Sequence, residues 1–319
     1  MRIGASFTRL QTLFLQKKFP RDLAQEIISY GSCQFPTLGF IVERWRAIEE
    51  FQAEPFWKIE VLHRRDGVNT VFSWERGRIF SRETAQAIFD DVMENPVAKV
   101  KHIESKPKSK WRPTPLETVE MEKKGRLLNM SAKRIMSVAE KLYTGGYISY
   151  PRTETNIFPK SLDLRPLVEA QQQDGRFGEF VQNVLLPNGI RPRNGKKSDE
   201  AHPPIHPLKC GQGLSGEEAR LFEFIARRFL ATCSKDAAGF ESVCRIDLRD
   251  EGFQAKGLVI TDRGYLEVYP YEKWSDKVLP QYQMNEQFRP DSVDLNEGSD
   301  SYLKLSVTYF EKVFQHLNA

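Results

Sequence analysis

Two strand-rich stretches separated by a long helical stretch constrain the fold of this chain most strongly. Alternating apolar and polar residues bounded by turn residues predict strands in both outer stretches. Helical spacing of apolar residues dominates the middle, from about Pro115 to Asp236. The predicted strands are 56–62, 70–74, 97–103, 243–248, 253–260 and 265–269, with turns at 65–67 and 262–264. A chain that leaves a β unit and returns to it indicates an α+β multidomain fold with an inserted helical domain.

The length of 319 residues also predicts two or more packed units, because a single compact core rarely holds so long a chain. In the opening segment, Pro20 and Pro36 are expected to separate short helices. The predicted parts are a helical segment at 1–54, a first β-rich part at 55–112, a helical domain at 113–236, a returning β-rich part at 237–298 and an atypical extension at 299–319.

Capping residues and prolines predict several element boundaries. Ser81 and Ser131 are expected N-caps, and Gly145 with its neighbouring glycine ends the second of these helices. The spacing within 215–218 matches a capping box that opens a further helix. Lys106–Pro113 contains two prolines and is expected to be an exposed connection into the helical domain.

Composition favours an aqueous compartment. No run approaches the roughly 20 apolar residues of a membrane span, and the N-terminus lacks the apolar core of a signal peptide. The four cysteines have no CxxC pair and no histidine at metal-ligand spacing, so inert thiols are expected rather than a zinc site. These cysteines are Cys33, Cys210, Cys233 and Cys244.

Positive charge is concentrated in one stretch. The whole chain carries a formal net charge of only +4. Residues 101–160 contain 13 Lys and Arg against 6 Asp and Glu, so the remaining residues sum to −3. This distribution is compatible with a surface that meets phosphates, and equally with a solvated basic surface.

The segment Gly146–Asn156, with the sequence Gly-Tyr-Ile-Ser-Tyr-Pro-Arg-Thr-Glu-Thr-Asn, carries the clearest chemical signal. Pro151 fixes the backbone directly after Tyr150. The guanidinium of Arg152 could share a bound group with Tyr150, and its planar donors match phosphate oxygens. A tyrosine hydroxyl is mostly protonated at neutral pH, so attack needs nearby positive charge or a base. Without further information, an ordinary structural tyrosine is the simpler interpretation.

A family resemblance reverses that preference. The segment resembles the active-site motif of type IA DNA topoisomerases, in the form found in the topoisomerase III branch. Three further segments resemble family motifs in the family's order along the chain: the helical segment after the Toprim domain, the Gly-x-x-Gln-x-Pro-Thr motif and the Ala-His-x-x-Ile segment. They are Arg2–Arg9, Ser29–Gly39 and Ala201–Pro207, and the resemblance extends over Arg2–Asp291.

The resemblance implies roles for individual residues. Tyr150 would be the nucleophile that becomes a 5′-phosphotyrosine, and Arg152 would orient the tyrosine and the scissile phosphate. His202 would contact the nearby phosphate backbone. Arg9 and Gln34 are weaker candidates for binding single-stranded DNA.

Two basic or polar features remain ambiguous in the sequence. Lys110, with Lys106, Lys108 and Arg112 around Trp111, could bind the DNA backbone and stack on a base, or could be a solvated linker. His206, which precedes a proline, is expected to be structural.

The resemblance further implies a β-rich arch, a helical domain that carries the tyrosine and closes against the Toprim side, and an opening segment from a DNA-binding helical domain. In the family, the Toprim domain holds Mg²⁺ and a catalytic glutamate and lysine, and precedes the segment at which this sequence starts. After Gly298 the family continues into a Gly-Ile-Gly-Thr-Asp motif, so the chain is expected to be truncated at both ends. Lacking the metal and the general acid, it is expected to cleave DNA poorly or not at all.

The resemblance also implies partners and a location. These are single-stranded DNA, a RecQ-type helicase and an OB-fold accessory protein, with no membrane, in the nucleus or in a mitochondrial form. Two alternatives stay open: a single-stranded DNA-binding fragment without catalysis, and a protein-interaction scaffold.

Overall fold

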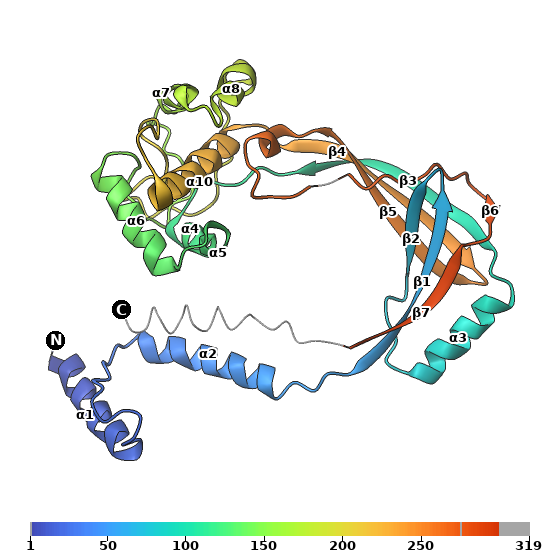
Figure 1. Ribbon diagram of the computed structural model, residues 1–319, viewed down its shortest axis with the longest axis horizontal. Helices are drawn as coiled ribbons and strands as arrows, with labels where there is room; N and C mark the ends of the chain where they lie inside the picture. Colours follow the sequence, from blue (N-terminus) through green and yellow to red (C-terminus); the bar gives the residue numbers. More distant parts are fainter. Residues whose placement is uncertain (1, 275, 300–319) are drawn as a thin grey trace. The chain divides into compact units, whose positions relative to one another are not determined.

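A computed structural model describes residues 2–274 and 276–299 of the chain. Within this range the chain divides into two compact units, residues 2–55 and Phe56–Gly298 (Figure 1). From residue 300 onward, the expected C-terminal extension lies outside the described residues.

The first unit contains the helices α1 (Arg2–Lys18) and α2 (Gln34–Glu49). The connection between them folds back onto α1, where the hydroxyl of Thr8 accepts the backbone N–H of Tyr30 at 2.9 Å. Pro36 does not separate two helices as expected. It lies within the first turn of α2, where a residue without an amide hydrogen leaves no helical hydrogen bond unmade.

A seven-stranded sheet forms the β-rich part of the second unit, in the order β6-β3-β4-β5-β2-β1-β7. The pairs β1–β2, β2–β5, β4–β5, β3–β4 and β3–β6 are antiparallel. The strands are β1 (Pro55–Arg65), β2 (Val68–Trp74), β3 (Ala98–Lys110), β4 (Ala237–Leu248), β5 (Glu251–Asp262), β6 (Gln287–Phe288) and β7 (Ser292–Ser299). Because β3 and β4 pair along their lengths, the long helical insertion between them in sequence starts and ends at the same place in the sheet.

Tight turns connect two of these hairpins. Asp66 and Gly67, between β1 and β2, have φ of 53° and 77°, as a two-residue type I′ turn requires. This confirms the expected turn. Arg249 and Asp250 make the same kind of connection between β4 and β5, with φ of 45° and 68°.

One face of the sheet packs against α3 (Arg82–Glu94), whose N-cap Ser81 accepts the N–H of Thr84 at 3.2 Å, as expected. The alternating burial of β2 reflects the period of two along a strand, with one face in the core and the other exposed. Buried side chains of the sheet core include Ile59, Val61, Phe72, Trp74, Val92, Val100, Ile246 and Phe253.

The first half of the exposed connection expected at Lys106–Pro113 belongs to strand β3. Residues up to Lys110 continue β3 and pair with β4, with Pro107 opposite Phe240. The expected exposure is correct, because β3 is exposed from Lys101 to Ser109. A proline fits there because the outer side of β3 pairs with β6 only at Ala98 and Lys99.

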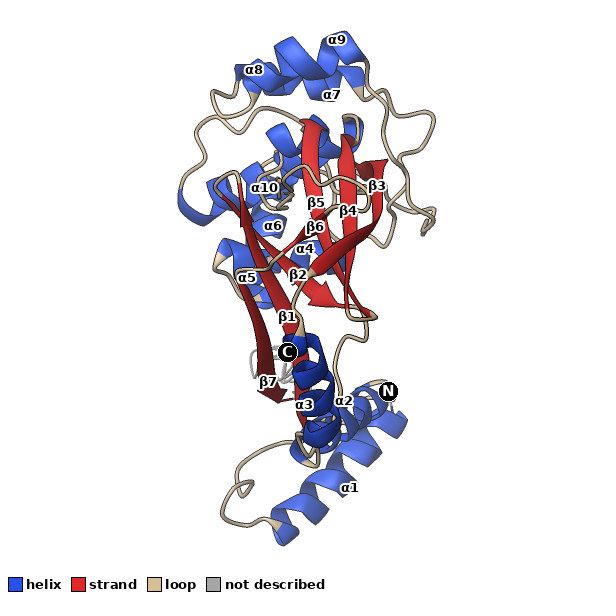
Figure 2. Cartoon of the chain, turned by 90° about the vertical axis from the view of Figure 1, so that its right-hand side faces the viewer, coloured by secondary structure: helices blue, strands red, loops and turns tan. Residues whose placement is uncertain are grey.

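Short helices build the inserted region, around two longer ones (Figures 1 and 2). The longer helices are α6 (Ala132–Thr144) and α10 (Gly216–Cys233), and both supply buried apolar side chains to one core. The shorter elements are α4 (Thr118–Lys123), α5 (Gly125–Leu128), α7 (Arg165–Glu169), a 3-10 helix at Ala170–Gln173, α8 (Gly178–Phe180), a π-helical turn at Val181–Leu185 and α9 (Leu186–Asn188).

One cap expected in the inserted region forms, while a second cap and a strand expected after it do not. Ser131 caps α6 as expected, accepting the N–H of Arg134 at 3.2 Å. Ser215 precedes α10, but its side chain makes no capping hydrogen bond, so the expected capping box does not form. The expected strand at 265–269 is instead a 3-10 helix at Gly264–Glu267. The rings of Tyr265 and Tyr269 are fully buried, with centroids 6.4 Å apart.

Candidate active site

Tyr150 lies in an extended segment that begins where α6 ends. Gly146 has φ of 69°, a left-handed conformation that glycine adopts without steric cost, and it redirects the chain after the helix. Ser149 then binds the returning segment through three hydrogen bonds. Its N–H donates to the His206 carbonyl at 3.0 Å, and its hydroxyl accepts the His206 N–H at 3.0 Å and donates to the Pro204 carbonyl at 3.1 Å. The backbone next to Tyr150 is therefore held by a segment more than 50 residues further along the chain.

The ring of Tyr150 is partly buried between two other rings. Its centroid lies 4.5 Å from that of His202, at an interplanar angle of 49°, and 5.3 Å from that of Tyr143, edge-on at 70°. The structure thus brings together Tyr150 and His202, which the sequence motifs selected separately. Tyr143 of α6 is 43% exposed and contacts Tyr150.

Arg152 is exposed and paired with Glu140 of α6. Its Nε donates to the Glu140 carboxylate at 2.9 Å. This hydrogen bond and the charge of Glu140 raise the pKa of Arg152, and the nearby Tyr150 contributes in the same direction to a smaller degree. Because exposed ion pairs contribute little net stability, a phosphate can replace Glu140 as the partner of Arg152 at small cost.

Sequence reasoning missed Glu140 and Asp199. Helical spacing gives a weak signal for Glu140, which lies one turn before Tyr143 on α6. Asp199 accepts five hydrogen bonds from the segments that carry Tyr150 and His202. Nothing in the sequence except its position three residues before His202 signals these contacts.

His206 lies beneath the site and is only 2% exposed. Its Nδ1 is 2.6 Å from the carbonyl oxygen of Pro204, so Nδ1 carries a hydrogen and donates it. The ring packs between Phe158 and Phe229, with centroids at 5.9 and 6.2 Å. These contacts agree with the structural role expected for this histidine.

Burial lowers the pKa of His206, which predicts acid sensitivity of folding. A histidine whose pKa is lower in the folded state binds fewer protons there, so its contribution is complete above the unfolded pKa of about 6.5 and is lost as pH falls below it. Between pH 7.5 and 5.5, the wild type is expected to lose about 1 kcal/mol more unfolding free energy than His206→Gln. Urea unfolding of both proteins at the two pH values measures this difference. Equal losses in the two proteins would contradict it.

The other candidates belong to the first unit or are bound by residues of this chain. Arg9 and Gln34 are exposed residues of α1 and α2 in the first unit. Lys110 donates to the Lys273 carbonyl at 2.7 Å and lies 3.6 Å from the carboxylate of Glu272, so its charge is partly neutralised within the protein.

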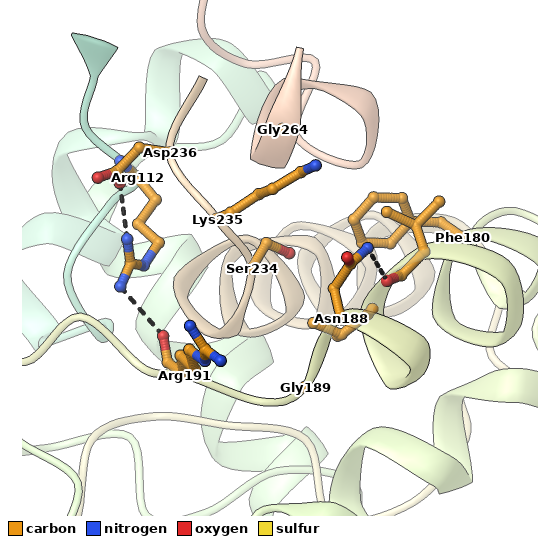
Figure 3. Close-up of a pocket in the computed structure, with 11 residues that line it drawn as sticks. Arg112, Phe180, Asn188, Gly189, Arg191, Ser234, Lys235, Asp236 and Gly264 are labelled. Carbon is orange, nitrogen blue, oxygen red and sulfur yellow. Dashed lines mark hydrogen bonds and ion pairs between the residues drawn. The ribbon is translucent and has the colours of Figure 1, made fainter. Parts of the chain in front are cut away.

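A cavity of about 450 Å³ lies where the inserted region joins β3, β4 and β5 (Figure 3). Arg112 forms an ion pair with Asp236 at 2.8 Å and donates to the Arg191 carbonyl at 3.2 Å across it. Lys235, also in the lining, pairs with Asp262 at 2.7 Å. Neither Tyr150 nor His202 lines this cavity, and aspartates neutralise two of its cations, so the candidate active site is elsewhere.

Within residues 2–274 and 276–299, no group of three or more His, Cys, Asp or Glu side chains is arranged to hold a metal ion. The Mg²⁺ that the family resemblance implies is expected in a Toprim domain. Burial raises the pKa of Cys244 to about 11 and that of Cys233 further, so neither thiol ionises at neutral pH. Among the described residues, no helix combines the length and the apolar character that a membrane span requires.

Comparison with known proteins finds matches that cover most of the chain. The sequence model of the DNA topoisomerase family matches residues 1–302. DNA topoisomerase 3-alpha of mouse is 54% identical over 302 residues, and that of human is 54% identical over 307 residues. These matches cover 94% and 96% of the chain. This chain therefore belongs to the DNA topoisomerase family, as its resemblance to the type IA branch implied.

The solved structure of topoisomerase I from Thermotoga maritima shares the fold. It superimposes with a TM-score of 0.69 at 19% sequence identity and covers 92% of this chain and 49% of that one. The chain spans just under a third of the length of the mouse and human relatives, 30% and 31% respectively.

Proposed function

We propose that this chain supplies the nucleophile and the arch of a type IA DNA topoisomerase that cuts one DNA strand through Tyr150. The observation that carries the proposal is the placement of the Tyr150 ring against His202, with Arg152 two residues further along the chain. The substrate is single-stranded DNA. Because the chain spans only part of the length of its relatives, family membership alone does not establish cleavage through Tyr150.

In the proposed reaction, the Tyr150 hydroxyl oxygen attacks a backbone phosphorus. The new bond joins Oη to phosphorus, and the bond from phosphorus to the 3′ oxygen breaks. The phenol proton passes to solvent or a base, and the departing 3′ oxygen takes up a proton. The cut strand then has a free 3′-hydroxyl and a 5′-phosphotyrosine, which preserves the ester for religation after strand passage.

Arg152 and His202 act on the phosphate in this proposal. The guanidinium donates two parallel hydrogen bonds to phosphate oxygens and opposes the charge that develops during attack. Exposed and adjacent to the Tyr150 ring, His202 can donate a further hydrogen bond to the strand. Arg9, Gln34 and Lys110 stay proposed DNA contacts, with Lys110 requiring release from Glu272.

The polarity of the covalent adduct tests the function. The assay uses this chain alone and a longer polypeptide in which the chain follows a Toprim domain, called the joined polypeptide below. With an oligonucleotide labelled at its 3′ end, the joined polypeptide should acquire the label on a denaturing gel. A 5′ label should instead appear on a shorter free strand.

The chain alone is expected to form little or no adduct. A 5′-labelled adduct would contradict the proposed polarity. Salt-dependent DNA binding with no adduct from the joined polypeptide would favour the non-catalytic alternative.

By resemblance, we further propose relaxation of negative supercoils and processing of recombination and repair intermediates in the nucleus. The proposed partners are a RecQ-type helicase and an OB-fold accessory protein, and the proposed cofactor is Mg²⁺ held by a Toprim domain. The mouse and human relatives are named DNA topoisomerase 3-alpha, which supports topoisomerase activity.

A further inference from the structure

Asp199 connects the two segments that carry the candidate active site. Its Oδ1 accepts the hydroxyl of Thr155 at 2.8 Å and the backbone N–H groups of Ala201 and His202 at 3.0 and 3.1 Å. Its Oδ2 accepts the hydroxyl of Thr153 at 3.2 Å and the N–H of Glu154 at 3.3 Å. One carboxylate therefore binds the backbone of the His202 loop and the residues that follow Tyr150.

The contact is reciprocal. The backbone N–H of Asp199 donates to the Thr155 hydroxyl at 3.0 Å, so this hydroxyl both donates to and accepts from the same residue. Thr153 also donates to the His202 carbonyl at 3.3 Å. The resulting network joins residues 44 to 49 positions apart in the sequence and fixes the His202 backbone to the segment after the nucleophile.

Hydrogen bonds stabilise the negative charge of the Asp199 carboxylate. Among the described residues, its carboxylate accepts hydrogen bonds from two threonine hydroxyls and three backbone N–H groups. The donors, first of all the His202 N–H and then the Thr155 hydroxyl, hold the pKa of this carboxyl well below its usual range. A negative charge beside a DNA-binding site repels phosphate, so Asp199 is not expected to be there to strengthen DNA binding.

We propose that Asp199 is a positioning residue that sets His202 against Tyr150, so that the phenol and the imidazole meet one phosphate in the geometry of attack. This role rests on the proposed function. It requires Asp199 to accelerate the cleavage step without contributing to DNA affinity. Misplacing a reacting group by about 1 Å can reduce a rate about 10²-fold.

The first test uses NMR on this chain alone and does not depend on catalysis. The Tyr150 ring should shift the resonances of the His202 ring, because their centroids are 4.5 Å apart. In Asp199→Ala, these resonances should move toward their values in Tyr150→Leu, which has no aromatic ring at position 150. Asp163→Asn is the matched control, since Asp163 is also exposed and accepts the N–H of the residue two positions later, at 3.0 Å. It should leave the resonances in place.

The second test separates cleavage from binding in the joined polypeptide. Asp199→Ala should slow single-turnover cleavage about 10²-fold. Asp199→Asn should slow cleavage less than Asp199→Ala does. The amide oxygen can still accept hydrogen bonds on one side of the network, whereas the amide nitrogen cannot accept those on the other side. Both variants should bind an uncleaved oligonucleotide as tightly as the wild type or more tightly, whereas a merely destabilised site would lose affinity and rate together.

Thr155→Val provides a variant that keeps the side-chain shape if Asp199→Ala does not fold. It removes the hydroxyl shared with Asp199 and should slow cleavage in the same direction. Wild-type His202 resonances and cleavage rates in Asp199→Asn and Thr155→Val would overturn the proposal. If the wild-type joined polypeptide failed to cleave, the proposed function would be at fault, while the NMR comparison would still decide whether Asp199 positions His202.

Discussion

Replacing Tyr150 with phenylalanine is expected to abolish the covalent DNA adduct of the joined polypeptide and to reduce plasmid relaxation at least about 10⁴-fold. The substitution removes only the attacking oxygen. Phenylalanine retains the ring that lies 4.5 Å from His202 and 5.3 Å from Tyr143, so folding and oligonucleotide affinity should remain close to those of the wild type. Gel detection of 3′-labelled adduct and relaxation of negatively supercoiled plasmid measure the two effects.

Tyr143→Phe is the matched control, because it deletes a phenolic oxygen from the ring adjacent to Tyr150. It should preserve adduct formation. If the adduct persisted in Tyr150→Phe and disappeared in Tyr143→Phe, the nucleophile would be Tyr143 and the proposal would be wrong.

Replacing Arg152 with alanine is expected to slow cleavage by about 10² to 10³-fold, the usual effect of removing one donor that stabilises transition-state charge. Arg152→Lys should recover only part of the rate, since an ammonium group lacks the planar pair of donors that fits a phosphate. Single-turnover cleavage of a labelled oligonucleotide measures both variants.

Arg134 offers a control on the same helix that Glu140 occupies. It is exposed and pairs with Glu217, with Nε at 2.7 Å, in the way that Arg152 pairs with Glu140. Arg134→Ala removes the same charge and should leave cleavage within about threefold of the wild type, as is usual for surface substitutions. Equal losses in Arg134→Ala and Arg152→Ala would indicate a general charge effect instead of a specific role for Arg152.

Glu140→Gln tests whether the ion pair restrains Arg152. Removing the carboxylate charge frees the guanidinium for phosphate, so oligonucleotide affinity should rise while cleavage is retained. Weaker binding in this variant would show that Glu140 presents Arg152 to the strand instead of competing with it.

Local sequence determined the features that depend on near neighbours. The Asp66-Gly67 turn and the caps Ser81 and Ser131 follow from backbone and hydrogen-bonding preferences within a few residues. The same locality explains the failures at 106–110 and 265–269. Whether Pro107 can join a strand depends on which strands pair with it. Likewise, the structure that Tyr265 and Tyr269 adopt depends on the surfaces that the surrounding chain provides for their rings.

For the candidate site, the sequence by itself determined which residue types were present and selected Tyr150, Arg152 and His202. Only the tertiary structure decided that His202 lies against Tyr150, that Glu140 pairs with Arg152 and that Asp199 joins the two segments. The physical reason is distance along the chain. A carboxylate has no sequence signal for donors 44 residues away, because those contacts exist only once the core beneath them has packed and brought both segments together.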